Sequence, residues 1–134
     1  MALKFSTGVR NAELDSIETT IGTTPRLTIY TGGSPANTTD APSGLLIFNY
    51  FLPADWMNAA TSGTKTKLGT WSGSAVDTGV AGYFRIVDIS ASTTHIQGSV
   101  SGSAGGGNMV LDNPNMVIDQ VVTISTFTLT AGNS

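Results

Sequence analysis

The sequence predicts a mainly β domain, an antiparallel β-sandwich of jelly-roll-like form with one N-terminal α-helix. Short apolar or alternating segments follow one another, separated by turns rich in Gly, Pro, Asn and Asp. Only residues 8–22 repeat apolar side chains with helical spacing. At 134 residues the chain has the size of one domain, 1–134. We divide it into an N-terminal arm (1–7), the helix (8–22) and the strands (26–130).

Few residues of this chain can do chemistry. It has one His and no Cys, only 11% of its residues are charged, and its net charge is −3. The six basic residues form no dense run, so we expect no nucleic-acid binding. The longest apolar run, 45–48, is too short to cross a membrane, so we expect no membrane contact. The start carries no apolar stretch of signal-peptide length, which favours folding in a cytosol.

The helix is predicted from one apolar face. Leu14, Ile17 and Ile21 follow i, i+3, i+7 spacing, and Glu13 lies in the first half of the helix, where its charge suits the dipole. Gly22 is a suitable residue to end it. The plain interpretation is an amphipathic helix that closes a core, and a partner-binding helix is the alternative.

The first half of the strand region has two clear segments. Residues 26–31 alternate, whereas 45–52 are apolar on both faces, which is typical of a central strand covered on both sides. Between them, 32–44 is a polar loop. After Pro53, we expect a short helical turn over 55–60 with Asp55 as its N-cap. Residues 61–66 then read as a flexible polar loop.

The second half predicts a strand pair, 68–72 with 82–88, around a turn at 77–79. Phe84 and Ile86 share one face, and Tyr83, Arg85 and Val87 share the other. Residues 94–100 alternate, with Ile96, Gly98 and Val100 inward. A Gly/Ser-rich loop, 101–108, precedes a short strand over 109–112 and a turn at 113–115.

The last predicted strand, 120–130, changes phase. Val122 and Ile124 occupy even positions, whereas Phe127 and Leu129 occupy odd positions. A regular strand would send these pairs to opposite faces of the sheet. We therefore predict a β-bulge near Ser125 and Thr126.

The candidate catalytic residues are isolated in sequence. His95 lies on the polar face of its strand, with no nucleophile-elbow motif in the chain, so a surface or interface role is favoured over catalysis. A glycosidase pair would have to come from carboxylates with no distinctive spacing. Capping and turn roles explain most of these carboxylates, which are Asp40, Asp55, Asp77 and Asp88. We predict that the protein is not an enzyme.

Two binding functions remain open alternatives. The segment 112–119 bunches oxygen ligands that calcium could use, although it lacks the Gly and the final Glu of an EF-hand loop. An Asx-rich turn explains it without metal, and we expect no cofactor. Exposed rings could stack on sugars, although such rings more often anchor cores or interfaces. The rings are Tyr30, Tyr50, Trp56, Trp71 and Tyr83.

Four segments of this chain resemble a group of small proteins encoded by tailed bacteriophages and prophages. They are GVRNAELDSIETTIG (8–22), LTIYTGGSPAN (27–37), LPADWM (52–57) and VTISTFTLT (122–130). The resemblance covers most of the chain and brings no catalytic residues with it. It implies a structural virion component made in the host bacterial cytoplasm, of the decoration (cement) or head–tail accessory kind.

The resemblance and the composition together predict a non-enzymatic capsid decoration protein. It would bridge neighbouring subunits of the major capsid protein, or other virion subunits, as a homo-oligomer. A neck or tail accessory protein and a carbohydrate- or receptor-binding module are the alternatives. The expected assembly contacts lie in the arm, in the strand 45–52 and in the Gly/Ser-rich loop. They are Met1, Lys4, Phe5, Phe48, Tyr50, Gly105, Gly106 and Asn108.

Overall fold

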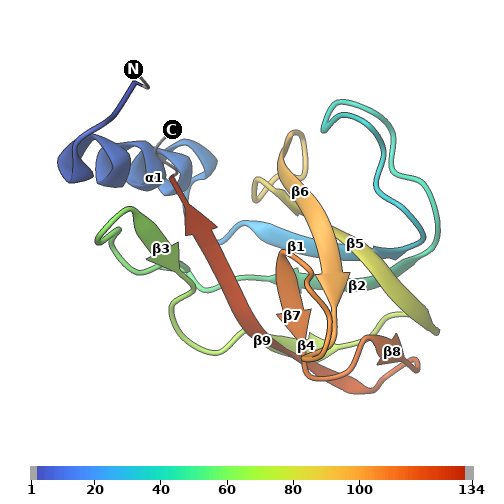
Figure 1. Cartoon of the computed structure of the whole chain (residues 1–134). Coiled ribbons are helices and arrows are strands. Elements are labelled where there is room, and N and C mark those ends of the chain that lie inside the picture. Colours follow the sequence, from blue (N-terminus) through green and yellow to red (C-terminus); the bar gives the residue numbers. More distant parts are fainter. Residues whose placement is uncertain (1–2, 132–134) are drawn as a thin grey trace.

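A computed structural model describes residues 3–131 of the chain (Figure 1). These residues form one helix and nine strands, which confirms a mainly β chain with an N-terminal helix. The elements are α1 (Thr7–Ile21), β1 (Arg26–Thr31), β2 (Leu46–Phe51), β3 (Thr64–Thr66), β4 (Ser72–Ser74), β5 (Gly79–Val87), β6 (Thr94–Ser101), β7 (Met109–Leu111), β8 (Asn115–Met116) and β9 (Val121–Thr130).

Helix α1 begins and ends at capping residues. The Ser6 hydroxyl accepts a hydrogen bond from Val9 N, and Gly22 ends the helix with φ of 92° while its N–H donates to Glu18 O. Leu14 and Ile21 are buried and Ile17 packs against the core. The predicted amphipathic helix is therefore confirmed, shifted by one residue at each end.

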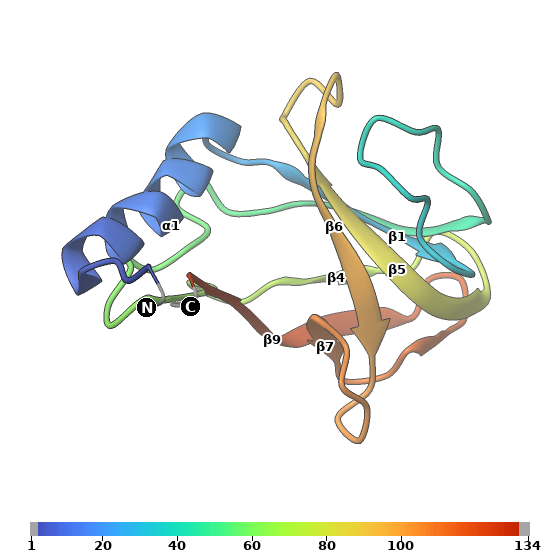
Figure 2. The ribbon, with the colours of Figure 1, turned by 45° about the horizontal axis from the view of Figure 1, so that its top comes forward.

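The strands form one curled sheet in the order β2-β1-β5-β6-β7-β9-β3, with β4 also paired to β9 and β8 to β5. Figure 2 shows the curl, in which β9, β7 and β4 lie across from β1, β5 and β6, with α1 at one end. The pairs are antiparallel except β6 with β7, which run parallel. The sheet is therefore mixed, where the sequence predicted an antiparallel arrangement.

The core fills the space inside the curl. Its aromatic centre is a chain of ring contacts in which Trp71 lies 6.2 Å from Trp56 and 5.7 Å from Phe127, and Phe127 lies 5.4 Å from Phe84. Both tryptophans are fully buried although they lie outside the strands. Trp56 is held in place because its indole Nε1 donates to Gly22 O at the end of α1.

The predicted phase break in the last strand is confirmed. Val110 pairs with Thr126 and Leu111 pairs with Ile124, so Ser125 is the extra residue on β9. Because of this shift, Val122, Ile124 and Phe127 all enter the core, and Leu129 packs against it.

Other expectations about the strands were wrong. Residues 55–60 form no helical turn, because Met57 makes a bridge to Lys67 instead. Part of the predicted loop 61–66 is strand β3. The segment 68–72 does not pair with 82–88, because β4 joins β9. Strand β2 lies at the end of the sheet order rather than at its centre, and its outward Phe51 is 50% exposed.

Candidate functional site

The expected assembly contacts do not form one surface. Phe48 is fully buried in the core, so its ring cannot face a partner in this fold, whereas Tyr50 packs against the core and is partly exposed. The loop residues Gly105 and Gly106 are exposed between β6 and β7, far from the start of α1 (Figure 2). Asn108 belongs to the same loop, and its Oδ1 accepts hydrogen bonds from Ser99 N and Oγ. Lys4 and Phe5 are exposed before α1, and Met1 lies outside the described residues.

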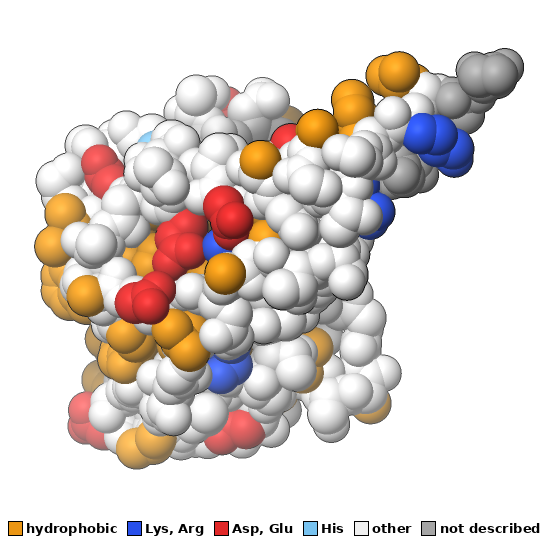
Figure 3. Space-filling view, turned by 90° about the vertical axis from the view of Figure 1, so that its left-hand side faces the viewer, with side chains coloured by type: hydrophobic (Ala, Val, Ile, Leu, Met, Phe, Trp, Pro, Cys, Tyr) orange, Lys and Arg blue, Asp and Glu red, His pale blue; other side chains and the backbone are white. Residues whose placement is uncertain are grey.

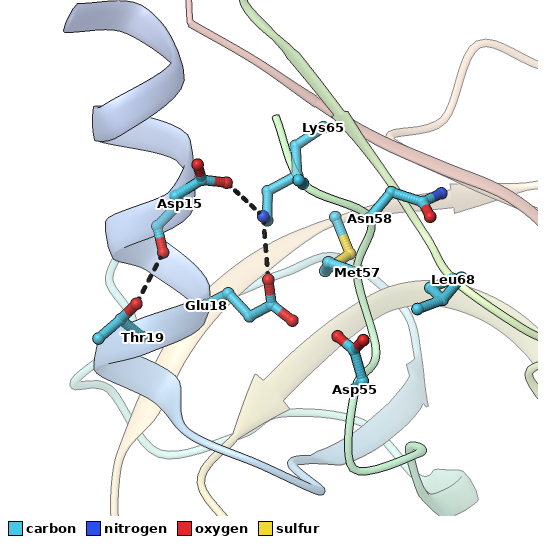
Figure 4. A pocket seen from close by; sticks show the side chains of 9 residues that line it. Asp15, Glu18, Thr19, Asp55, Met57, Asn58, Lys65 and Leu68 are labelled. Carbon is cyan, nitrogen blue, oxygen red and sulfur yellow. Dashed lines mark hydrogen bonds and ion pairs between the residues drawn. The ribbon is translucent and has the colours of Figure 1, made fainter. Parts of the chain in front are cut away.

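A charged hollow lies where α1 meets the sheet. Lys65 of β3 is 1% exposed, and its Nζ lies 2.7 Å from Asp15 Oδ1 and 2.9 Å from Glu18 Oε1 (Figure 4). The two carboxylates are three residues apart on α1, which places them on one face of the helix. Figure 3 shows this group on the surface as acidic side chains around a basic one. The hollow measures about 380 Å³, and Asp55 also lines it.

The charges of this group are fixed by their contacts. Burial of the Lys65 amine works against its positive charge, but the hydrogen bonds to Asp15 and Glu18 outweigh it and raise the pKa of Lys65 above 10.5. The hydrogen bond from Lys65, helped by that from Ala60 N, lowers the pKa of Asp15 below 3.8. An amine that is protonated at neutral pH is a poor nucleophile or base, so this geometry fits a clamp between α1 and β3.

Four other candidate carboxylates accept hydrogen bonds from backbone N–H groups. Asp88 binds the 90–93 turn, where hydrogen bonds from the Ser92 hydroxyl and from Thr93 N and Ser92 N lower its pKa to about 2. Asp40 accepts from Asn37 N, and Asp77 accepts from Thr78 N. Asp112, in the segment weighed for calcium, accepts from Asn113 N and Thr123 N. Within residues 3–131, no three His, Cys, Asp or Glu side chains gather as a metal site would require.

His95 lies over the helix. It lines a hollow of about 190 Å³ together with Ser16, Ile17, Thr20 and Ile21. No carboxylate lines this hollow, so nothing there would orient the imidazole for proton transfer. The candidate sugar-stacking rings are also largely covered: Trp56 and Trp71 are fully buried, and the Tyr83 hydroxyl is bound to Ser43 O at 2.6 Å.

The sequence did not reveal an exposed apolar surface at the end of the domain opposite α1. We call it the apolar end, and it consists of Val76, Val80, Val117, Ile118 and Val121, each 44–63% exposed. These residues come from two chain segments that are joined by hydrogen bonds: Ala75 N donates to Gln120 O, and Asp119 N donates to Ala75 O. Figure 1 shows β8 and the starts of β5 and β9 together at this end.

The acidic side chains of this region are Asp77 and Asp119, which lie within the same two segments. The possible signal in the sequence was a cluster of branched apolar residues beside turn-forming residues. It was not recognisable, because the two segments are about forty positions apart and come together only through the β5–β8 and β4–β9 pairings and the hydrogen bonds beside them.

No helix of the described residues is long and apolar enough to span a membrane. Comparison of the chain with protein-family models, with curated proteins and with solved structures found no match.

Proposed function

We propose that this protein is a non-enzymatic structural protein of a phage virion, a capsid decoration protein that bridges neighbouring capsid subunits. The observation that carries the proposal is the apolar end, where five branched side chains are about half exposed on a chain with few charges. Exposed apolar patches of this kind mark interaction sites. The resemblance of four segments to phage proteins suggests the partner, a subunit of the shell.

The apolar end is suited to weak, repeated contacts. Burying its five side chains would release about 4–6 kcal/mol in total, since each is already half covered. Association itself costs a comparable amount, so a single contact of this size would bind weakly. A homo-oligomer that engages several shell subunits at once would gain affinity through multivalency. The acidic Asp77 and Asp119 favour a capsid surface that is apolar with basic residues at its edge.

The finer assignment of the curled mixed sheet to a jelly-roll-like sandwich stays a prediction. A neck or tail accessory protein would use the same surface, and copy number separates the two locations. A shell protein should approach the copy number of the major capsid protein in purified virions, whereas a neck or tail protein should be far rarer.

The test uses particles that lack the protein, to which purified protein is added back. Native protein should co-sediment with the particles and restore their resistance to heat and low salt. The double variant Val117→Asp, Ile118→Asp should lose both effects, because charge on the apolar end must be desolvated on binding. Ile89→Asp is the matched control, because Ile89 is equally exposed but lies in the loop after β5, outside the apolar end. Particles that are equally robust without the protein would refute the proposal, as would a double variant that binds normally.

A further inference from the structure

The outer face of the sheet, on the side away from the core, is partly covered by the loop 32–44. The loop is fastened at three points by side chains of β5 and β6. The Tyr83 hydroxyl binds both the N and the O of Ser43, and Gln97 Nε2 donates to Pro35 O at 2.8 Å. Arg85 Nη2 lies 3.5 Å from Asn37 O, which is a weak contact.

Arg85 is buried without a carboxylate partner. It is the seventh of the nine residues of β5, and it is 3% exposed. Nε donates to Gln97 Oε1 at 3.2 Å, and Nη1 makes no hydrogen bond within residues 3–131. Among the described residues, no ion pair joins Arg85 to a carboxylate within 4 Å. A guanidinium cannot lose its proton in a protein, and a buried charge without a counter-ion is costly.

A second arginine lies on the same face. In the register of β1, Thr28 is opposite both Arg85 and Asn49, and Arg26 is two positions away on that face. Arg26 Nε is buried without a hydrogen-bond partner among the described residues. Its guanidinium carbon lies 4.7 Å from the centre of the Phe51 ring, which fixes the side chain by a cation–π contact.

The two arginines line one pocket of about 250 Å³. Its polar wall also includes Thr28, Tyr30, Asn49 and Thr94, and its apolar wall is Pro42, Leu46, Val87 and Ala91. Arg85 and Thr94 also line a neighbouring hollow that contains Asp40, whose Oδ2 accepts from Asn37 N. Asp88, next to Val87, is engaged by its own turn. Among residues 3–131 no carboxylate lies within 4 Å of either guanidinium group, although Asp40 shares the neighbouring hollow with Arg85.

We propose that this pocket binds the carboxylate of a small organic acid or of an acidic side chain from another protein. Arginine matches a carboxylate with paired N–H donors, and two arginines without counter-ions would supply the charge. The four apolar lining residues suit the hydrocarbon part of such a group. They would leave the outer oxygens of a phosphate without partners, and no helix N-terminus lines the pocket. The proposal does not depend on the virion function.

The test is a titration of the whole protein followed by backbone amide NMR. The probes are butyrate, which mimics a glutamate side chain, its neutral analogue butyramide, inorganic phosphate, and a glutamate residue capped at both ends. Butyrate or the capped glutamate should give saturable shifts at residues 26, 28, 85 and 94. Tighter binding of the capped glutamate indicates a protein side chain as the natural ligand, and tighter binding of butyrate indicates a free acid. Either result supports the proposal.

The variants test whether the arginines make the site. Arg85→Met should weaken butyrate binding by about tenfold or more, as expected for loss of a charged hydrogen bond. Lys67→Met changes the net charge equally but lies outside the pocket, so it should bind like the native protein. If Arg85→Met does not fold, Arg26→Met gives the second test, with the same expected loss. The proposal is overturned if butyramide or phosphate binds as tightly as butyrate, if Lys67→Met loses binding equally, or if neither carboxylate probe gives saturable shifts.

Discussion

At the scale of single residues, Lys65 shows how a charged side chain can serve the fold. It is almost fully buried, and both of its partners come from α1. Lys65→Met keeps the apolar stem and removes the charge, so it should lower the free energy of unfolding by about 1–3 kcal/mol. Lys65→Ala should cost a further 1–2 kcal/mol or so, because it also leaves a cavity. Urea denaturation of both variants measures the two effects, and a Lys65→Ala protein as stable as the native one would contradict the clamp.

The same ion pairs predict how stability depends on pH. The lowered pKa of Asp15 gives stabilisation that is present above its ordinary value of 3.8 and is lost as the pH falls through the lowered pKa. The raised pKa of Lys65 gives stabilisation that is present below 10.5 and is lost as the pH rises through the raised pKa. Lys65→Met should therefore flatten both limbs of the stability curve. Parallel curves for variant and native protein would rule this out.

At the scale of elements, the attachment of α1 depends on one glycine. Gly63 has φ of 73°, its N donates to Asn11 Oδ1, and its O accepts from Ala131 N. A Cβ at this position would collide with the guanidinium of Arg10, which itself donates to Ala131 O. The helix, the turn before β3 and the end of β9 therefore meet at a position where a side chain would displace the Arg10 guanidinium.

Gly63→Ala should be clearly more destabilising than Gly69→Ala. Gly69 has a similar φ of 76°, and a Cβ there would meet no atom within 4 Å. Gly69→Ala thus isolates the cost of the left-handed backbone, about 1–2 kcal/mol. Gly63→Ala adds the displacement of the Arg10 guanidinium and of its hydrogen bond to Ala131 O, for a total of about 2–3 kcal/mol. Urea midpoints compare the two variants, and hydrogen exchange should show faster exchange in α1 for Gly63→Ala alone. Equal costs would mean that Arg10 moves aside freely.

The elements that the sequence predicted well are those with a local signal. Leu14, Ile17 and Ile21 indicate the helix through their own spacing, and the change of parity after Ile124 indicates the bulge. Strands β3 and β8, of three and two residues, are too short to carry a period and exist only because β9 and β5 pair with them. The short helical turn expected at 55–60 failed for a related reason, since tertiary contacts of Trp56 and Met57 decide the backbone there.

The candidate sites were less predictable because they depend on register and on loop placement. Arg26 and Arg85 are 59 positions apart by numbering, and only the β1–β5 pairing puts them on one face. The sequence predicted that Arg85 lies on the other face of its strand from Phe84 and Ile86. Nothing in it indicated that the loop 32–44 would bury Arg85. The apolar end likewise needs the β5–β8 and β4–β9 pairings.

At the scale of the whole molecule, β9 joins the curled sheet together. Its ten residues pair with β4 near its start, with β7 in the middle and with β3 at its end. The bulge at Ser125 lets one strand serve all three partners while its apolar residues face the core. Its start belongs to the apolar end, and its last residues pair with the strand that carries Lys65. Strand β9 therefore runs from one end of the domain to the other, and the bulge at Ser125 keeps its apolar side chains facing the core along the way.

Deleting Ser125 should consequently unfold the protein, although Ser125 itself is exposed. Without the extra residue, either Phe127 and Leu129 turn away from the core or the pairing with β3 slips by one position. Removing Phe127 from the core alone should cost about 3–5 kcal/mol, a large share of the stability of a domain. Ser125→Ala keeps the residue count and should change stability by less than about 0.5 kcal/mol. Thermal unfolding followed by near-ultraviolet circular dichroism distinguishes the two. A cooperative transition at the native temperature in the deletion variant would show that the bulge is dispensable and that β9 tolerates either phase.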